Sequence, residues 1–100
     1  MTKKIMLSCN AGMSTSMLVQ KLQKSVADRG LDFEIVAYPM GQASSRLDDC
    51  DLILLGPQVS YLKDDWGKRT DTPISVIPML DYGRMNADNI INDALKILGE

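Results

Sequence analysis

The sequence predicts a single three-layer α/β/α domain whose central sheet has four parallel strands. Two observations indicate this fold class. Short apolar segments alternate along the chain with segments of helical periodicity, and the expected strand 51–56 has an unbroken apolar centre, as a strand buried on both faces must have. Alternating strands and helices form parallel sheets with right-handed connections. We expect the strand order 2-1-3-4, in which the first and third strands are central neighbours.

The first half of the chain contains two predicted strands and one clear helix. Residues 4–8 form the first strand, and residues 33–38, which Pro39 closes, form the second. Between them a helix is expected from Ser14 onward, with Gly30 as its stop. Its apolar stripe consists of Met17, Leu18, Leu22 and Val26, opposite the polar residues Gln20, Lys21, Lys24 and Asp28.

The second half continues the same alternation. Residues 41–47 are expected to form a short helix or an irregular connection, and residues 57–68 a helix with Val59, Leu62 and Trp66 along one side. The fourth strand, 74–77, stops at Pro78 and leads into a loop. Asn86 caps a final helix that Gly99 ends. The core-facing residues of that helix are Ile90, Ile91, Ala94, Leu95 and Leu98.

Length and charge exclude several classes of protein. One hundred residues, 45% of them hydrophobic, suit one domain over residues 1–100. The net charge is −2 without a basic stripe, which argues against nucleic-acid binding. No apolar run approaches the ~20 residues of a membrane span, and the start lacks the features of a signal peptide. We therefore expect a cytoplasmic chain that does not insert into a membrane.

Two absences narrow the chemistry further. The chain has no histidine, which excludes Ser-His-Asp and Cys-His catalysis and any imidazole metal ligand. Its two cysteines, Cys9 and Cys50, are far apart and form no Cys-x-x-Cys motif, so neither a zinc site nor a dithiol motif is predicted.

The segment after the first strand has the character of an anion-binding loop. Backbone N–H groups at a helix start carry partial positive charge and lack intrahelical partners. Small residues let these amides turn inward around a phosphate-sized group, and Gly12 permits conformations closed to other residues. Hydroxyl side chains add donors or cap the helix. The predicted phosphate-binding residues are Asn10, Ala11, Gly12, Met13, Ser14, Thr15 and Ser16.

Cys9 stands at the mouth of this loop and is the predicted catalytic residue. A helix N-terminus lowers a cysteine pKa from ~8.5, so the thiolate is favoured and can attack phosphorus. The simpler interpretation is a buried cysteine at the end of a strand, before a capped helix. The glycine and three hydroxyl residues that follow favour the functional interpretation.

Cys50 provides an internal comparison. It starts the third strand whereas Cys9 ends the first, and in parallel neighbours these positions lie at opposite edges of the sheet. A disulfide between them is geometrically excluded. We expect Cys50 to have a packing role, which counts against a third hypothesis, a redox regulator that would need two nearby cysteines.

A cysteine-dependent phosphatase of the low-molecular-weight type is the main alternative function. Its loop has arginine six positions after the cysteine, where this chain has Thr15. Without a bidentate guanidinium the loop can hold phosphate but is poorly equipped to hydrolyse it. Asp64 and Asp65 are expected to be an exposed helix face rather than the missing acid. A phosphoryl carrier fits these residues better, since slow hydrolysis benefits a carrier.

Three segments together resemble a known family. They are Cys-Asn-Ala-Gly-Met-Ser-Thr-Ser at 9–16, Leu-Leu-Gly-Pro-Gln-Val-Ser-Tyr at 54–61 and Asp-Tyr-Gly at 81–83. In these segments, and over its whole length and element order, the chain resembles the IIB components of the bacterial phosphotransferase system, in particular the lactose, cellobiose and chitobiose group.

The resemblance implies a function and partners. Cys9 would accept a phosphoryl group from a histidine of a IIA protein and donate it to a cellobiose-, chitobiose- or lactose-like sugar bound by the membrane IIC component. No cofactor is implied, and we expect a monomer. Position in the sheet, rather than the resemblance, suggests three further residues. Gln58 follows the third strand beside the Cys9 loop and is expected to support the loop or a partner. Tyr82 and Arg84 follow the fourth strand at the same edge and are expected to form part of a partner surface. The alternatives to these roles remain open. Gln58 could simply be part of a strand-to-helix turn, and Tyr82 and Arg84 could belong to an ordinary loop with a solvated arginine.

Overall fold

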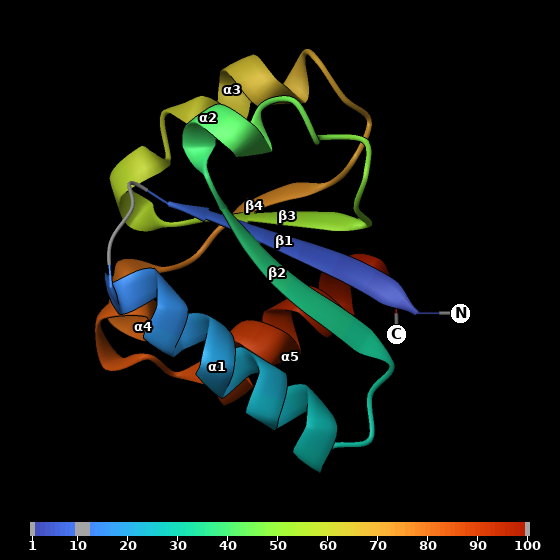
Figure 1. Cartoon of the computed structure of the whole chain (residues 1–100), viewed down its shortest axis with the longest axis vertical. Helices are drawn as coiled ribbons and strands as arrows, with labels where there is room; N and C mark the ends of the chain where they lie inside the picture. The colour runs from blue at the N-terminus through green and yellow to red at the C-terminus, as the bar shows by residue number, and fades with distance from the viewer. Residues whose placement is uncertain (1, 10–12, 100) are drawn as a thin grey trace.

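The computed structural model describes residues 2–9 and 13–99, except for the side chains of residues 9, 13–15 and 40. Four parallel strands form one sheet in the order β2-β1-β3-β4, which confirms the predicted topology (Figure 1). The strands are β1 (Lys3–Cys9), β2 (Phe33–Pro39), β3 (Leu52–Leu55) and β4 (Ile74–Val76).

The register of the strands fixes which residues share the carboxyl edge of the sheet. Ser8 pairs with Tyr38 of β2 and with Leu55 of β3, and the next residue of β1, Cys9, pairs with Pro39. The amide of Gly56 donates a 2.9 Å hydrogen bond to the carbonyl oxygen of Ser8. The ends of the first and third strands are therefore joined at this edge.

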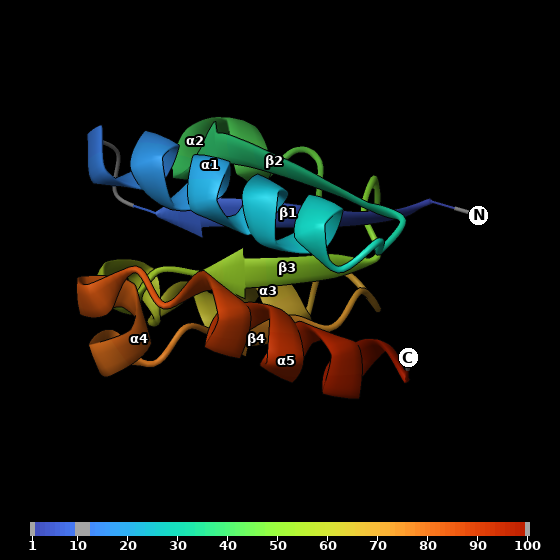
Figure 2. The ribbon, with the colours of Figure 1, turned by 90° about the horizontal axis from the view of Figure 1, so that it is seen from below.

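One face of the sheet is covered by α1 (Met13–Asp28) and α5 (Ala87–Leu98), which run side by side (Figure 2). The predicted stripe of α1 is confirmed at Leu18, Leu22 and Val26. Met17 is a correction, because it is 53% exposed. It lies four and seven residues before the exposed Lys21 and Lys24, a spacing that places all three on the solvent side of the helix.

Buried apolar side chains from the strands, α1 and α5 form the first core cluster beneath these two helices. Its members are Ile5, Leu7, Leu18, Leu22, Val26, Ile35, Leu52, Leu54, Ile77, Ile90, Ile91 and Ala94.

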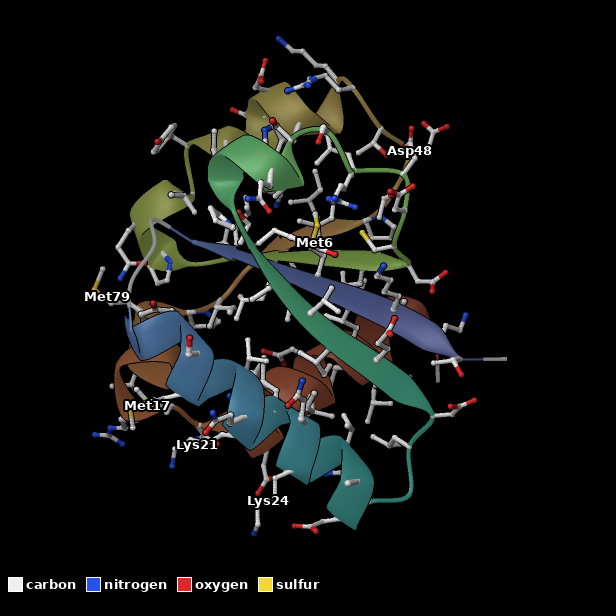
Figure 3. All side chains as sticks on the ribbon, viewed as in Figure 1. Met6, Met17, Lys21, Lys24, Asp48 and Met79 are labelled. Atoms are coloured by element: carbon white, nitrogen blue, oxygen red, sulfur yellow. The ribbon has the colours of Figure 1, made fainter. Side chains whose placement is uncertain are left out.

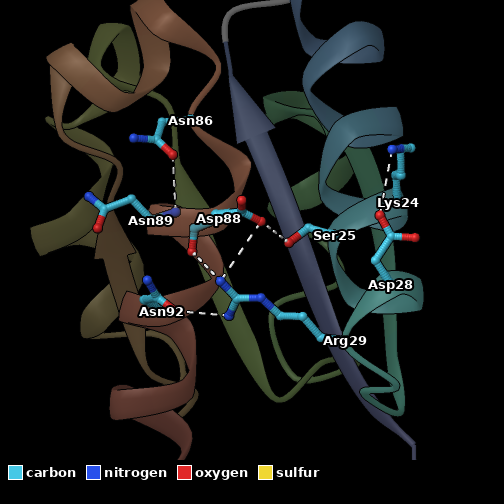
Figure 4. A network of polar contacts seen from close by, with 8 residues as sticks. All are labelled: Lys24, Ser25, Asp28, Arg29, Asn86, Asp88, Asn89 and Asn92. Carbon is cyan, nitrogen blue, oxygen red and sulfur yellow. Dashed lines mark hydrogen bonds and ion pairs between the residues drawn. The ribbon is translucent and has the colours of Figure 1, made fainter.

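The two helices are also joined by polar contacts (Figure 4). The buried hydroxyl of Ser25 donates a 2.7 Å hydrogen bond to Oδ1 of Asp88, and Arg29 reaches the side chain of Asn92 and the carbonyl oxygen of Asp88. The predicted caps are confirmed: Asn86 accepts a hydrogen bond from the amide of Asn89, and Gly99 has a positive φ of 74°. The α1–α5 interface thus combines an apolar core with polar side chains that are hydrogen-bonded to each other.

The opposite face of the sheet is covered by short helices: α2 (Met40–Ala43), the 3₁₀ helix η1 (Pro57–Val59) and α3 (Leu62–Gly67). We predicted a single helix over 57–68, and the structure divides it into η1 and α3. Val59 is 0% and Trp66 2% exposed, so the two short helices bury the stripe that one was expected to bury. The second core cluster contains Met6, Ala43, Leu47, Ile53, Leu55, Val59 and Trp66.

The prediction of a loop after the fourth strand is wrong, because α4 (Met79–Arg84) lies there. This helix has no side-chain cap, contains Gly83 and exposes its first apolar residues, so it carries no periodic signal. Asp81 anchors it: the residue is 8% exposed, and its carboxylate accepts a 2.7 Å hydrogen bond from the side-chain Nδ2 of Asn89. The helix ends at Met85, whose φ of 51° is left-handed.

Among residues 2–9 and 13–99, no helix is both long enough and apolar enough to cross a membrane.

Candidate functional site

The carboxyl ends of β1 and β3 form a topological switch point. The chain leaves β1 for α1 on one face of the sheet, and it leaves β3 for η1 on the other face. In parallel α/β sheets, ligands bind where neighbouring connections diverge in this way. Cys9 is the last residue of β1, and the Gly56 corner is bonded to the residue before it. Cys9 and the 56–58 corner therefore lie side by side at this edge of the sheet.

Most of the predicted phosphate-binding loop lies outside the described part of the chain. This applies to Asn10, Ala11 and Gly12, and to the side chains of Cys9, Met13, Ser14 and Thr15. Ser16, in the first turn of α1, is exposed and lines a groove of about 470 Å³ between α1 and β2. The roles assigned to residues 9–16 stay predictions.

The three residues predicted to contact or support a partner lie in elements that follow β3 and β4. Gln58 is exposed in η1, directly after the Gly56 corner, and Arg84 is exposed at the end of α4. Tyr82 is half-buried and packs against the first core cluster. Tyr82 thus contributes to attaching α4, while Gln58 and Arg84 are available at the surface.

Exposed apolar side chains gather at this end of the molecule. Met79 and Leu80, in the first turn of α4, are 76% and 63% exposed, and Met17 in α1 is 53% exposed. Figure 3 places Met79 and Met17 at the end of the molecule where α1 begins. We call these three residues the apolar rim. Sequence reasoning missed it, because only the position of α4 shows that Met79 and Leu80 do not enter the core.

Sequence reasoning also missed Ser8. This residue is 0% exposed, and its Oγ has no hydrogen-bond partner among the residues that the structure describes. The available signal was a lone hydroxyl that follows the apolar run 5–7, directly before Cys9.

Cys50 lies at the opposite end of the sheet, as predicted. It precedes β3, and the following amide, that of Asp51, donates to the carbonyl oxygen of Lys4 near the start of β1. Cys50 is partly buried and packs against the second core cluster. Burial raises the pKa of its thiol to about 11; Lys4 lowers that pKa in part, and Asp51 and Asp49 add to the rise. The thiol is therefore protonated, and poorly nucleophilic, at neutral pH.

Comparisons with known proteins agree with this architecture. The model of the family "PTS system, Lactose/Cellobiose specific IIB subunit" matches residues 4–93. The chain is 40% identical to the PTS system cellobiose-specific EIIB component of Lactococcus lactis subsp. lactis, with 96% of each chain covered. It is 39% identical to the galactose-specific EIIB component of Lactococcus lactis subsp. cremoris and 35% identical to the oligo-beta-mannoside-specific EIIB component of Bacillus subtilis, again with 96% of each chain covered.

Two solved structures share the fold. The cellobiose-specific phosphotransferase IIB component from Borrelia burgdorferi has a TM-score of 0.81 and 31% identity, and the comparison covers 98% of this chain and 93% of that one. The lactose-specific IIB component domain from Streptococcus pneumoniae has a TM-score of 0.80 at 15% identity, covering 93% of this chain and 97% of that one.

Proposed function

The chain belongs to the lactose- and cellobiose-specific IIB subunits of the phosphotransferase system, and on this basis we propose that Cys9 is its phosphorylated residue. Cys9 would accept a phosphoryl group from a histidine of a IIA partner and transfer it to a sugar bound by the membrane IIC component. The observation that carries this assignment is the position of Cys9, which ends β1 at the switch point, four residues before the start of α1.

Each transfer exchanges one bond to phosphorus for another. In the first, the Cys9 thiolate forms an S–P bond as the N–P bond to the donor imidazole breaks, and the imidazole nitrogen keeps the electron pair. In the second, a sugar hydroxyl oxygen forms an O–P bond, loses its proton and releases the thiolate. Neither step needs a cofactor on this chain, because positioning and electrostatic stabilisation supply most of the catalysis in phosphoryl transfer.

The start of α1 supplies the electrostatics that these steps need. A helix of 16 residues presents unpaired amides and partial positive charge at its N-terminus, which favours both a thiolate and a phosphoryl group nearby. We assign the cradle to residues 10–16. The phosphatase alternative is weaker, because Thr15 stands where such an enzyme has its arginine.

The apolar rim is the proposed docking surface for the partners. Met17 and Met79 lie at the end of the molecule where α1 begins, and the exposed Leu80 follows Met79 in α4. Protein interfaces enclose an apolar centre with a polar rim, and the exposed Gln58 and Arg84 would supply polar contacts. Tyr82, which packs against the core, would hold α4 in place.

The sugar is proposed only as a class. Relatives of similar identity are named for cellobiose, galactose and oligo-beta-mannoside, so overall similarity does not separate these substrates. We propose a cellobiose-, chitobiose- or lactose-like sugar, recognised by IIC rather than by this chain. We also propose that the chain is a single carrier domain over residues 1–100 that works as a monomer in the cytoplasm. Phosphoenolpyruvate would feed the cascade upstream of IIA.

Intact-mass measurement tests the assignment. Parent protein incubated with a phosphorylated IIA protein should gain one phosphoryl group, Cys9→Ser should gain none, and the control Cys50→Ser should gain as much as the parent. Labelling of Cys9→Ser to the level of the parent would show that the site is wrong. Steady hydrolysis of an aryl phosphate by the parent would instead favour the phosphatase.

A further inference from the structure

Ser8 and Ser25 are both buried serines, but their hydroxyl groups differ. Ser25 is 6% exposed and donates a 2.7 Å hydrogen bond to Asp88. Ser8 is 0% exposed, and its Oγ finds no partner among the described residues. The large majority of buried side-chain polar atoms are hydrogen-bonded, and an exception in a native structure calls for a reason.

The surroundings of Ser8 are apolar. Paired residues of parallel neighbours share one face of the sheet, so Ser8 lies between its partners Tyr38 and Leu55. Both partners belong to or pack against the second core cluster, which also holds Val59 of η1. The main chain of Ser8 is firmly held, because its carbonyl oxygen accepts from Gly56. The Ser8 side chain is thus held at the end of β1, one residue before Cys9, and its hydroxyl bonds to no group of the described residues.

We propose that Ser8 is a positioning residue whose hydroxyl is unpaired in the resting chain and becomes hydrogen-bonded when Cys9 carries a phosphoryl group. This inference rests on the proposed function of Cys9. A hydroxyl can donate and accept, so it can bond a main-chain group or a water molecule that shifts as the charged group arrives. An unpaired buried hydroxyl raises the free energy of the resting state, and pairing it lowers that of the phosphorylated state. Both effects favour uptake of the phosphoryl group.

A thermodynamic comparison of Ser8→Ala with Ser25→Ala tests the proposal. The equilibrium between phosphorylated IIA and this chain is measured by intact mass, and thermal unfolding is followed for the resting and phosphorylated forms. For Ser8→Ala we expect an unchanged or higher unfolding midpoint in the resting form, a lower midpoint in the phosphorylated form, and a phosphorylation equilibrium constant reduced about threefold to tenfold, the value of one net hydrogen bond. Ser25→Ala should lower the midpoints of both forms and leave the phosphorylation equilibrium unchanged.

Two outcomes would overturn the role of Ser8 while leaving that of Cys9 intact. One is a resting Ser8→Ala protein that is destabilised or fails to fold, because removal of an unpaired hydroxyl cannot have that effect. The other is an unchanged phosphorylation equilibrium. If the parent chain itself takes up no phosphoryl group, the proposed function fails instead, so the two failures are distinguishable.

Discussion

The two ends of the sheet each carry one cysteine, and the surroundings of the two cysteines have opposite effects on a thiolate. At the amino end, Cys50 is partly buried beside Asp49 and Asp51, and its pKa rises to about 11. At the carboxyl end, Cys9 leads into a 16-residue helix, whose N-terminus favours negative charge. The same end carries the apolar rim and the Ser8 hydroxyl, which has no hydrogen-bond partner within residues 2–9 and 13–99. On the proposed function, the amino end would serve stability, and the carboxyl end would serve chemistry and partner binding.

The largest effect should come from the core that supports both ends. Leu22 is 0% exposed between α1 and the sheet, so Leu22→Ala should lower the free energy of unfolding by ~2–5 kcal/mol. Met79→Ala, in the apolar rim, should change it by no more than ~0.5 kcal/mol. Urea unfolding followed by the fluorescence of Trp66, the single tryptophan, measures both. Equal losses would mean that the rim belongs to the core.

Alkylation compares the two cysteines directly. Cys9 should react with iodoacetamide at least ~30-fold faster than Cys50 near pH 7, because its thiolate is more populated even after allowance for lower intrinsic nucleophilicity. The rate at Cys9 should level off with a midpoint below ~8.5, whereas that at Cys50 should keep rising toward pH 11. Cys9→Ser and Cys50→Ser isolate the two rates. A midpoint above ~8.5 at Cys9 would count against an anion-favouring loop.

A charge placed in the apolar rim should slow partner binding without harming the fold. With IIA in limiting amount, Leu80→Glu is expected to lower the second-order rate constant of phosphorylation about tenfold. This is the effect of burying one unpaired charge at an interface edge. Ile97→Glu is the matched control, because Ile97 is also an exposed apolar residue but lies at the C-terminal end of α5, whereas α4 precedes the N-terminal end of that helix. Equal rates for both variants would remove the rim from the docking surface.

The smallest effect is expected at the surface of α1. Lys24 and Asp28 form a 3.5 Å ion pair with side chains that are 79% and 66% exposed. Lys24→Ala should therefore change the free energy of unfolding by no more than ~0.5 kcal/mol. Arg29→Ala should cost more, because Arg29 bonds to two residues of α5. Chemical denaturation at low and high salt separates the two cases.

Much of the fold could be predicted because each strand is a distinct apolar segment between helical ones. The unbroken apolar centre of β3, Leu52–Leu55, indicated a strand buried on both faces, and β3 does lie inside the sheet. The errors have local causes. The six-residue α4 exposes its apolar first turn, and a tight 3₁₀ turn at Pro57 divides the predicted helix, although Val59 and Trp66 still face the core.

The candidate site was predictable only in its topology. A cysteine between a strand and a helix can be placed at the carboxyl edge from the order of elements alone. The pairing state of the Ser8 hydroxyl depends on what surrounds it from β2, β3 and η1, and the exposure of Met79 and Leu80 depends on how Asp81 anchors α4 to Asn89. Such features arise from packing between distant segments, which periodicity does not encode.

Peptide mapping of the unaltered chain identifies the phosphorylated residue without any substitution. After phosphorylation by IIA, trypsin should separate the two cysteines into peptides 5–21 and 47–63. We expect the phosphoryl group on Cys9 in the first peptide, lost on mild acid treatment as expected for an S–P bond, and none in the second. A phosphoryl group on any other residue, or no uptake from a competent IIA donor, would contradict it.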